Sequence, residues 1–262
     1  MSRLFVRASN NYAQNGNAIL SGVPISVSIW VYPVSNANDQ ELFSITDNSA
    51  GNSDAIRLEC NFTSINVLQF NLRQGGGETT IPSGSSAPST NTWSNVVGTI
   101  DGSKNQSTYL NGSLLGTVST SNAPSALAVT NIGAYVSNSG ANIINPFDGR
   151  IAVVGVWNVA LKAAEITSLS NGALPTTIRS ASLVAYWPMD GLQSPEPDFA
   201  GTRKNMTLSG TPALAAGPPV MLFTPRIPQS LAPVIAPSVI FRKTLSQIGG
   251  RVGSRQPQGW AS

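Results

Sequence analysis

Short stretches in which apolar and polar residues alternate, separated by turn signals, run from the N-terminus to residue 172. In the clearest stretch, residues 24–35, the apolar positions are Ile25, Val27, Ile29 and Val31. A period of two residues places one face of a strand toward a core. Similar stretches follow at 41–47, 55–62, 66–74, 94–101, 107–118 and 129–136. Together they predict an all-β protein.

The segment from Phe147 to Gly172 carries the strongest local signal. Residues 149–157 are rich in the branched and aromatic side chains that pack on pleated sheets. Residues 160–169 then place apolar side chains at helical spacing, and Gly172 follows as a stop. The segment therefore predicts a buried strand that leads into one short helix. Asn111-Gly112, flanked by apolar runs, predicts a hairpin turn.

Three blocks of sequence carry a family resemblance. Residues 25–35 contain Trp30 within an early strand, residues 92–117 combine Trp93, Asp101-Gly102 and Asn111-Gly112, and residues 147–166 form the closing strand and helix. In this order and spacing the blocks resemble laminin-G-like domains of the concanavalin-A-like lectin and glucanase family. The resemblance implies a jelly-roll β-sandwich, a fold that serves lectins, enzymes, adhesins and virion proteins.

Residues 180–210 contain a strand of the form Leu-Val-Ala-Tyr-Trp-Pro and a loop with SPEPD. Such a segment normally opens a domain of this family, but here it follows the closing helix. We expect it to complete the same sandwich in a permuted arrangement, within a domain spanning 1–218. The alternative is the start of a second domain. This version of the segment resembles laminin-G-like proteins of tailed phages and environmental bacteria.

Residues 219–262 differ from the rest in proline content, charge and apolar content. They hold six prolines and five basic residues but no acid, a net charge of +5, whereas the other 10 basic and 12 acidic residues give −2. Proline blocks helix interiors and central strands, which predicts an extended arm. Apolar residues are too frequent for a disordered tail, so we expect the arm to lie on a partner. The predicted contact residues are Phe223, Arg226, Phe241, Arg242, Lys243, Arg251, Arg255 and Trp260.

Composition limits the chemistry. The chain has no histidine, which removes the usual catalytic base and metal ligand, and a single cysteine, which removes intrachain disulfides. A glycosidase needs two carboxylates facing one cleft, but the acids are scattered along the sequence, and the family's Glu-x-Asp-x-x-Glu motif does not occur. We therefore expect no enzyme activity. The scattered glutamates are Glu41, Glu59, Glu78, Glu165 and Glu196.

Carbohydrate binding in this family uses exposed aromatic platforms and often a calcium ion. Four tryptophans match framework positions and are expected in the core: Trp30, Trp93, Trp157 and Trp187. For calcium, Asp101 and Asp148 match turn positions of the family. The acidic pair of the closing strand is replaced by Ala152 and Val153, and the early family acids are absent from residues 6–12, where Arg7 stands in place of the first one. We expect no cofactor and keep Asp101 and Asp148 as the calcium candidates.

The N-terminal sequence shows no signal-peptide core, and no apolar run would span a membrane. These features and the arm lead us to expect a structural virion protein of a tailed phage. It would be a capsid decoration or cement protein, or a head or tail appendage, made in the host cytoplasm and located in the virion. Its partners would be the major capsid protein or other virion subunits, as a homo-oligomer.

The alternative function is a carbohydrate-binding, lectin-like or adhesin module with glycans as ligands. An intracellular scaffold is a more distant alternative. We do not expect nucleic-acid binding, because the five basic residues of the arm are widely spaced and lack a stacking platform.

Overall fold

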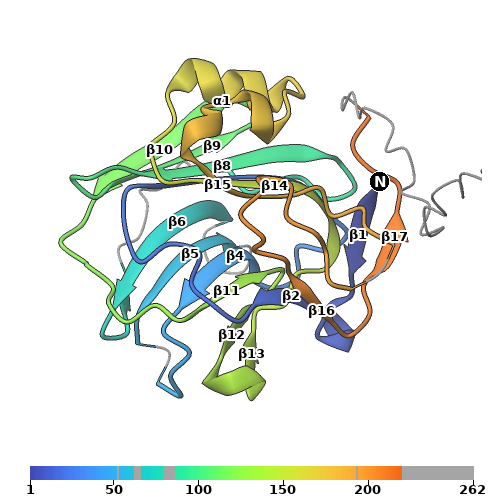
Figure 1. Cartoon of the computed structure of the whole chain (residues 1–262), viewed down its shortest axis with the longest axis horizontal. Coiled ribbons are helices and arrows are strands. Elements are labelled where there is room, and N and C mark those ends of the chain that lie inside the picture. Colours follow the sequence, from blue (N-terminus) through green and yellow to red (C-terminus); the bar gives the residue numbers. More distant parts are fainter. Residues whose placement is uncertain (52, 62–65, 79–85, 193, 220–262) are drawn as a thin grey trace, which may run out of the picture. The chain divides into compact units, whose positions relative to one another are not determined.

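The computed structural model describes residues 1–51, 53–61, 66–78, 86–192 and 194–219. Within them, two large antiparallel sheets face each other across a hydrophobic core, and a helix covers part of the outer face of one sheet (Figure 1). The predicted all-β sandwich with one short helix is confirmed for this part of the chain. The arm predicted over 219–262 lies outside the described residues, apart from Pro219.

The eight-stranded sheet contains, in spatial order, β10 (Ser113–Ser119), β9 (Asn105–Leu110), β8 (Ser94–Ile100), β3 (Ile25–Pro33), β14 (Gly149–Trp157), β1 (Ser2–Phe5) and β17 (Ala213–Ala215), with β15 (Leu183–Trp187) paired to β14. The seven-stranded sheet has the order β16 (Thr207–Ser209), β2 (Tyr12–Asn15), β11 (Val129–Ile132), β4 (Gln40–Thr46), β5 (Ala55–Asn61), β6 (Val67–Gln74) and β7 (Gly77–Glu78). A separate hairpin joins β12 (Tyr135–Ser137) to β13 (Asn142–Ile144).

The core lies between the two sheets, where the alternation in the sequence places it. Ile25, Val27, Ile29 and Val31 of β3 are all fully buried in one cluster with side chains from the opposite sheet. The sheets approach closely at Gly98 of β8, where a Cβ atom would lie 2.5 Å from the Phe70 ring of β6. A side chain at residue 98 would therefore push the two sheets apart.

The helix α1 (Ala163–Ser170) packs on the outer face of the eight-stranded sheet, above β8 (Figure 1). Its buried residues Ile166 and Leu169 join Val97 and Trp157 in a second, smaller apolar cluster. Gly172, at a φ of +94°, follows the C-cap residue Asn171 as the stop that the sequence predicted. The described residues also form short 3-10 helices: η1 (Arg7–Ser9), η2 (Asn138–Gly140), η3 (Pro175–Thr177) and η4 (Ser180–Ser182).

The segment after the helix contributes strands to both sheets. β15 pairs with β14, β17 pairs with β1 at the N-terminus, and β16 pairs with β2. The Asn111-Gly112 turn connects β9 to β10, and both residues have the positive φ that a type I′ hairpin turn requires.

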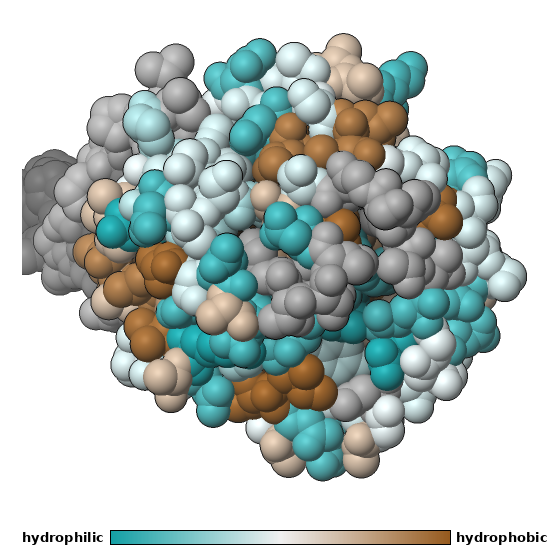
Figure 2. Space-filling model, turned by 180° about the vertical axis from the view of Figure 1, so that it is seen from behind, coloured by the Kyte–Doolittle hydropathy of each residue, from teal (hydrophilic) through white to brown (hydrophobic). Residues whose placement is uncertain are grey.

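Exposed apolar side chains are dispersed. Seen from the side opposite to Figure 1, apolar patches alternate with hydrophilic surface (Figure 2). Large apolar side chains that are exposed include Val6, Val34, Leu114, Leu192 and Phe199. Of the helices in the described residues, none has the length and apolar character needed to cross a membrane.

Candidate functional site

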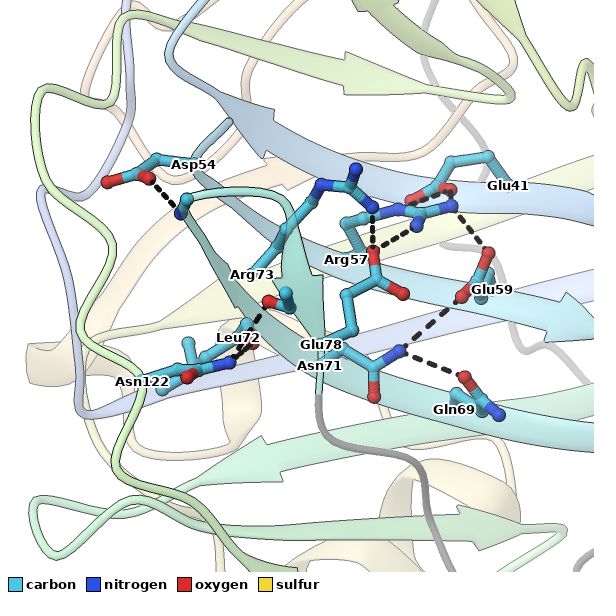
Figure 3. Close-up of polar contacts among 12 residues, drawn as sticks. Glu41, Asp54, Arg57, Glu59, Gln69, Asn71, Leu72, Arg73, Glu78 and Asn122 are labelled. Carbon is cyan, nitrogen blue, oxygen red and sulfur yellow. Dashed lines mark hydrogen bonds and ion pairs between the residues drawn. The ribbon is translucent and has the colours of Figure 1, made fainter. Parts of the chain in front are cut away.

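The outer face of the seven-stranded sheet carries a cluster of charged and amide side chains on β4, β5, β6 and β7 (Figure 3). In β5, Ile56 and Leu58 enter the core, so Arg57 and Glu59 point to the opposite face. The register pairs Glu41 with Glu59 and Arg57 with Asn71, which places these side chains side by side. The expectation that the acids are scattered was wrong for Glu41, Glu59 and Glu78, because strand pairing gathers them.

Arg57 is the centre of this cluster. Its Nη2 atom donates to Glu41 Oε2 at 2.8 Å and to Glu59 Oε2 at 2.5 Å, and its Nη1 atom donates to Glu78. Arg73 also donates to Glu78, at 2.8 Å. Three carboxylates therefore share two guanidinium groups, and one of those groups holds all three.

Amides and an aromatic ring extend the cluster. The side-chain amide of Asn71 donates to Gln69 Oε1 at 2.9 Å and to Glu59 Oε1 at 3.4 Å. The Arg57 guanidinium carbon lies 5.0 Å from the centre of the Tyr135 ring, which β12 places over the sheet. Such an arginine–aromatic contact adds about 1 kcal/mol or more when it is shielded from water.

The electrostatics of the cluster follow from its burial. Burial raises the pKa of Glu41 from 4.5 to about 8, against the opposing effect of Arg57. Burial also raises the pKa of Glu59. Burial acts in the same direction on Glu78, but Arg57 and Arg73 outweigh it and lower the pKa of that carboxyl. At pH 7 Glu41 therefore holds a proton.

Three buried polar atoms in this cluster have no hydrogen-bond partner within the described residues: Glu41 Oε1, Asn71 Oδ1 and the Tyr135 hydroxyl. An unsatisfied buried polar group costs about 1–3 kcal/mol. A protonated Glu41, an amide oxygen and a phenol together offer both donors and acceptors.

A pocket of about 170 Å³ opens beside the cluster and is lined by Arg57, Arg73, Tyr135, Ile144 and Asn145. The hairpin β12–β13 forms one wall, and it is fixed to β4 because the backbone N–H of Glu41 donates to the Asn145 carbonyl at 2.8 Å. Pockets for drug-sized ligands measure roughly 300–1,000 Å³. The smaller volume here matches a single ring-sized group.

The calcium candidates lie in separate local networks. Asp101 accepts hydrogen bonds from the backbone N–H groups of Ser103 and Asn105 and from the Asn105 side chain, and the side-chain bond is the main cause of its lowered pKa. It therefore shapes its own turn. Among the residues that the structure describes, no group of three or more acidic or cysteine side chains is placed to hold a metal ion.

Asp148 borders a wider cavity of about 540 Å³, which Arg7 also lines. The Nη1 atom of Arg7 donates to the backbone carbonyls of Asp39 and Pro146, at 2.9 Å each. Two carbonyl oxygens that converge on one point are typical cation ligands. Here the cationic group that they bind is the arginine of the chain itself.

The other residues singled out from the sequence divide into three groups. Trp30, Trp157 and Trp187 are buried, as expected. Trp93 differs, because it is only half-buried and contacts Tyr32. The predicted arm contacts Phe223, Arg226, Phe241, Arg242, Lys243, Arg251, Arg255 and Trp260 lie outside the described residues.

Several solved structures are similar to this chain. A candidate carbohydrate-binding protein from Bacteroides ovatus is similar with a TM-score of 0.55 and 16% identity, over 79% of this chain and 57% of that protein. A heptameric SAP-like pentraxin from Limulus polyphemus gives a TM-score of 0.49 and 19% identity, over 61% of this chain and 75% of that one. The CBM40 of the Ruminococcus gnavus IT-sialidase, bound to α2,3-sialyllactose, gives 0.48 and 17%, over 57% and 84%.

No curated protein sequence matches the chain. The sequence pattern of the concanavalin A-like lectin/glucanases superfamily matches residues 7–167, which is more than half of the chain. The matched region contains β3, β4, β5, β6, β8 and β14, and with them every residue of the polar cluster on the seven-stranded sheet. The chain therefore belongs to the concanavalin A-like lectin/glucanases superfamily.

Proposed function

We propose that this protein is a carbohydrate-binding module that holds one sugar residue in the pocket beside Tyr135. The observation that carries the proposal is the group of unpartnered buried polar atoms at Glu41, Asn71 and Tyr135. Of these residues Tyr135 lines the pocket, and its hydroxyl can donate to or accept from a sugar hydroxyl. The fold shared with the candidate carbohydrate-binding protein of Bacteroides ovatus supports the same class of function.

The geometry of the cluster favours binding of a sugar without its hydrolysis. The side chains of Glu41 and Glu59 are 0% and 6% exposed, and both are bonded to Arg57. A glycosidase needs one carboxyl at the leaving oxygen and a second at the sugar or at a water molecule. Two carboxyls held on one guanidinium beneath the surface do not offer that arrangement.

The test is a glycan array with the purified full-length protein, followed by calorimetry on the best ligand. The decisive variant is Tyr135→Phe, which removes one hydroxyl and keeps the ring that packs against Arg57. We expect binding to weaken by about fivefold to tenfold, the worth of one hydrogen bond. Stability should stay the same or rise, because an unsatisfied buried hydroxyl is lost.

The matched control is Tyr109→Phe, which changes a partly buried tyrosine of the other sheet in the same way. Its glycan affinity should equal that of the wild type. If the array shows no ligand, the proposed function is wrong. If a ligand binds equally well to the wild type and to Tyr135→Phe, the pocket is not the binding site.

A second candidate function is a structural role in a phage virion, which we infer from the composition of residues 219–262. Five basic side chains, no acid and many apolar side chains favour an arm that binds a surface. The partners would be the major capsid protein or other virion subunits, the protein would be located in the virion, and repeated copies would multiply a weak contact. Nothing in the described residues bears on this role.

Co-sedimentation of the full-length protein with particles from its source tests this second role. We expect the wild type to sediment with particles, and a variant with Phe241 and Trp260 changed to Ser to remain in the supernatant. A matched control changes Leu114, an exposed apolar residue of β10, to Ser and should still sediment. Free protein in every case would leave only the carbohydrate-binding function.

A further inference from the structure

We propose a second ligand site, specific for carboxylate-bearing sugars, on the outer face of the eight-stranded sheet at Arg150, Tyr32 and Trp93. The register pairs Arg150 with Tyr32, and Trp93 directly precedes Ser94, which pairs with Val31. The neighbours Val31 and Ile151 enter the core, so these three side chains lie on the opposite face. The site is separate from the pocket at Tyr135, which belongs to the other sheet.

The three side chains contact one another in a row. The Arg150 guanidinium carbon lies 4.8 Å from the centre of the Tyr32 ring, and the Tyr32 and Trp93 ring centres are 5.6 Å apart at 57°. All three residues are partly exposed. The two aromatic rings and the guanidinium group are therefore accessible to solvent. Their contacts with one another fix their positions.

Arg150 differs from the other arginines of the two sheets because no carboxylate of the described residues pairs with it. Arg3, Arg57 and Arg73 each pair with a glutamate. The Arg150 side chain makes no ion pair or hydrogen bond in the described part of the chain, and its Nε atom is buried without an acceptor. The contact with Tyr32 offsets only about 1 kcal/mol of this cost. A charged, partly buried group without a partner is prepared for an anionic ligand.

The shape of the groups selects the class of anion. A guanidinium is planar and binds a carboxylate through two parallel hydrogen bonds. Aromatic rings beside it pack against the apolar C–H face of a sugar ring, as in other small-ligand sites with few polar groups. A sugar acid, such as a uronic or sialic acid, joins a carboxylate to such a ring. Charge disfavours a nucleic acid, because residues 1–218 hold 10 basic and 12 acidic side chains.

The helix leaves this part of the sheet open. α1 packs on β8 through Val97, and its last residue, Ser170, donates to the Asn95 side chain at 2.8 Å. Trp93 lies two residues before Asn95 in the sequence, and it is partly exposed. The aromatic pair therefore borders the covered region without being covered by α1.

Calorimetry with short galacturonic acid oligomers, and with their methyl esters, tests the site. The two probes share the sugar ring and differ in the charge. We expect the acid to bind the wild-type protein at least tenfold more tightly than the ester. Arg150→Gln should weaken binding of the acid by about tenfold to hundredfold, the worth of hydrogen bonds between charged groups, and leave the ester unchanged. Trp93→Ala should weaken both probes.

Three further variants keep the outcome specific. Arg179→Gln removes a surface arginine that already pairs with Glu165, so affinity for the acid should not change. Tyr135→Phe alters the pocket of the other sheet and should also leave the acid bound, which separates this inference from the proposed function. Arg150→Lys, which keeps the charge without the planar fork, should weaken binding less than Arg150→Gln and guards against a folding defect.

Equal affinity for acid and ester, or an Arg150→Gln variant that binds the acid as tightly as the wild type, would overturn the proposal. Absence of binding to either probe would do the same. A single-stranded oligonucleotide that binds more tightly than the acid, and loses affinity in Arg150→Gln, would assign the site to nucleic acid instead.

Discussion

Arg3 and Arg57 are both buried in the sandwich, with side chains 5% and 8% exposed, but their surroundings differ. Arg3 faces one carboxylate, Glu196, whose Oε2 atom accepts from its Nε atom at 3.1 Å. The other guanidinium nitrogens donate to the carbonyls of Pro212 and Gly191. Glu196 Oε1 accepts from the backbone N–H groups of Asp190 and Gly191. Every polar atom of this pair therefore has a partner.

Arg57 faces three carboxylates, and the polar atoms of its cluster are not all satisfied. Glu41 Oε1 has no partner among the described residues, and Glu41 is protonated at pH 7 because burial raises its pKa to about 8. The pair at Arg3 connects the first strand to the last loops of the domain. The comparison shows that one arginine is placed to hold the fold together, whereas the other supports a face with unused hydrogen-bonding capacity.

Glu196→Gln should have the largest effect, because it leaves the charge of Arg3 buried and unpaired. We expect the free energy of unfolding to fall by about 3–5 kcal/mol, as measured by urea denaturation at pH 7. The double variant Arg3→Met, Glu196→Met should recover part of this loss, since no charge remains to be compensated. A loss below about 1 kcal/mol in the single variant would contradict the structural role of the pair.

Glu41→Gln makes the same chemical change in the other cluster, and its effect should depend on pH. The pKa of Glu41 is about 8 in the folded protein and 4.5 in the unfolded chain. Between these values the folded state binds the extra proton, so this group makes stability fall as pH rises, by up to about 1.4 kcal/mol per pH unit. Above about pH 8 the penalty is constant.

The variant should therefore match the wild type near pH 5 and exceed its stability near pH 9. Arg57 keeps Glu59 and Glu78 as partners, so no charge is left unpaired. The measurement is urea denaturation of both proteins from pH 5 to 9, and the informative quantity is the difference between the curves. Parallel curves would show that Glu41 is ionised at pH 7. A protonated carboxyl would then no longer distinguish the Arg57 cluster from the Arg3 pair.

Part of the Arg57 cluster could be predicted from the sequence. Arg57 and Glu59 in β5, and Gln69, Asn71 and Arg73 in β6, alternate with core residues, so a period of two already places each set on one face. Glu41 could not be added, because an irregularity between Glu41 and Phe43 shifts the register of β4 against β5. Local propensity does not determine such a shift.

The Arg3 pair lies beyond sequence reasoning for a different reason. Its partners are 193 positions apart, and Glu196 belongs to a loop whose path depends on the completed sandwich. The fold itself was accessible, because strand alternation, the Asn111-Gly112 turn and the helix stop after Ser170 are local features. Trp93 shows the limit of framework matching, since its position in the family pattern predicts burial but not how much of the ring stays exposed.

Arg7 extends the comparison to an arginine held by carbonyl oxygens. Arg7→Met should lower the free energy of unfolding by about 1–3 kcal/mol, because the carbonyls of Asp39 and Pro146 lose a charged donor.

Because Arg7 already supplies the cation at this point, a chelator should leave the melting temperature and glycan affinity of the wild type unchanged. A chelator-induced drop in either quantity would indicate a metal ion and return attention to Asp148 and Asp101.

Arg179→Gln should have the smallest effect of the series. Arg179 pairs with Glu165 at 2.6 Å, but the two side chains are 35% and 23% exposed, so water screens the pair. We expect a loss of about 0–1 kcal/mol at low salt, and less at about 1 M salt. Glu165→Ala should cost more, because Glu165 Oε2 also accepts from the Lys162 backbone N–H at the start of α1. Thermal denaturation of both variants at the two salt concentrations measures this order. Equal losses in the two variants would show that the capping bond at the start of α1 adds no stability beyond the ion pair.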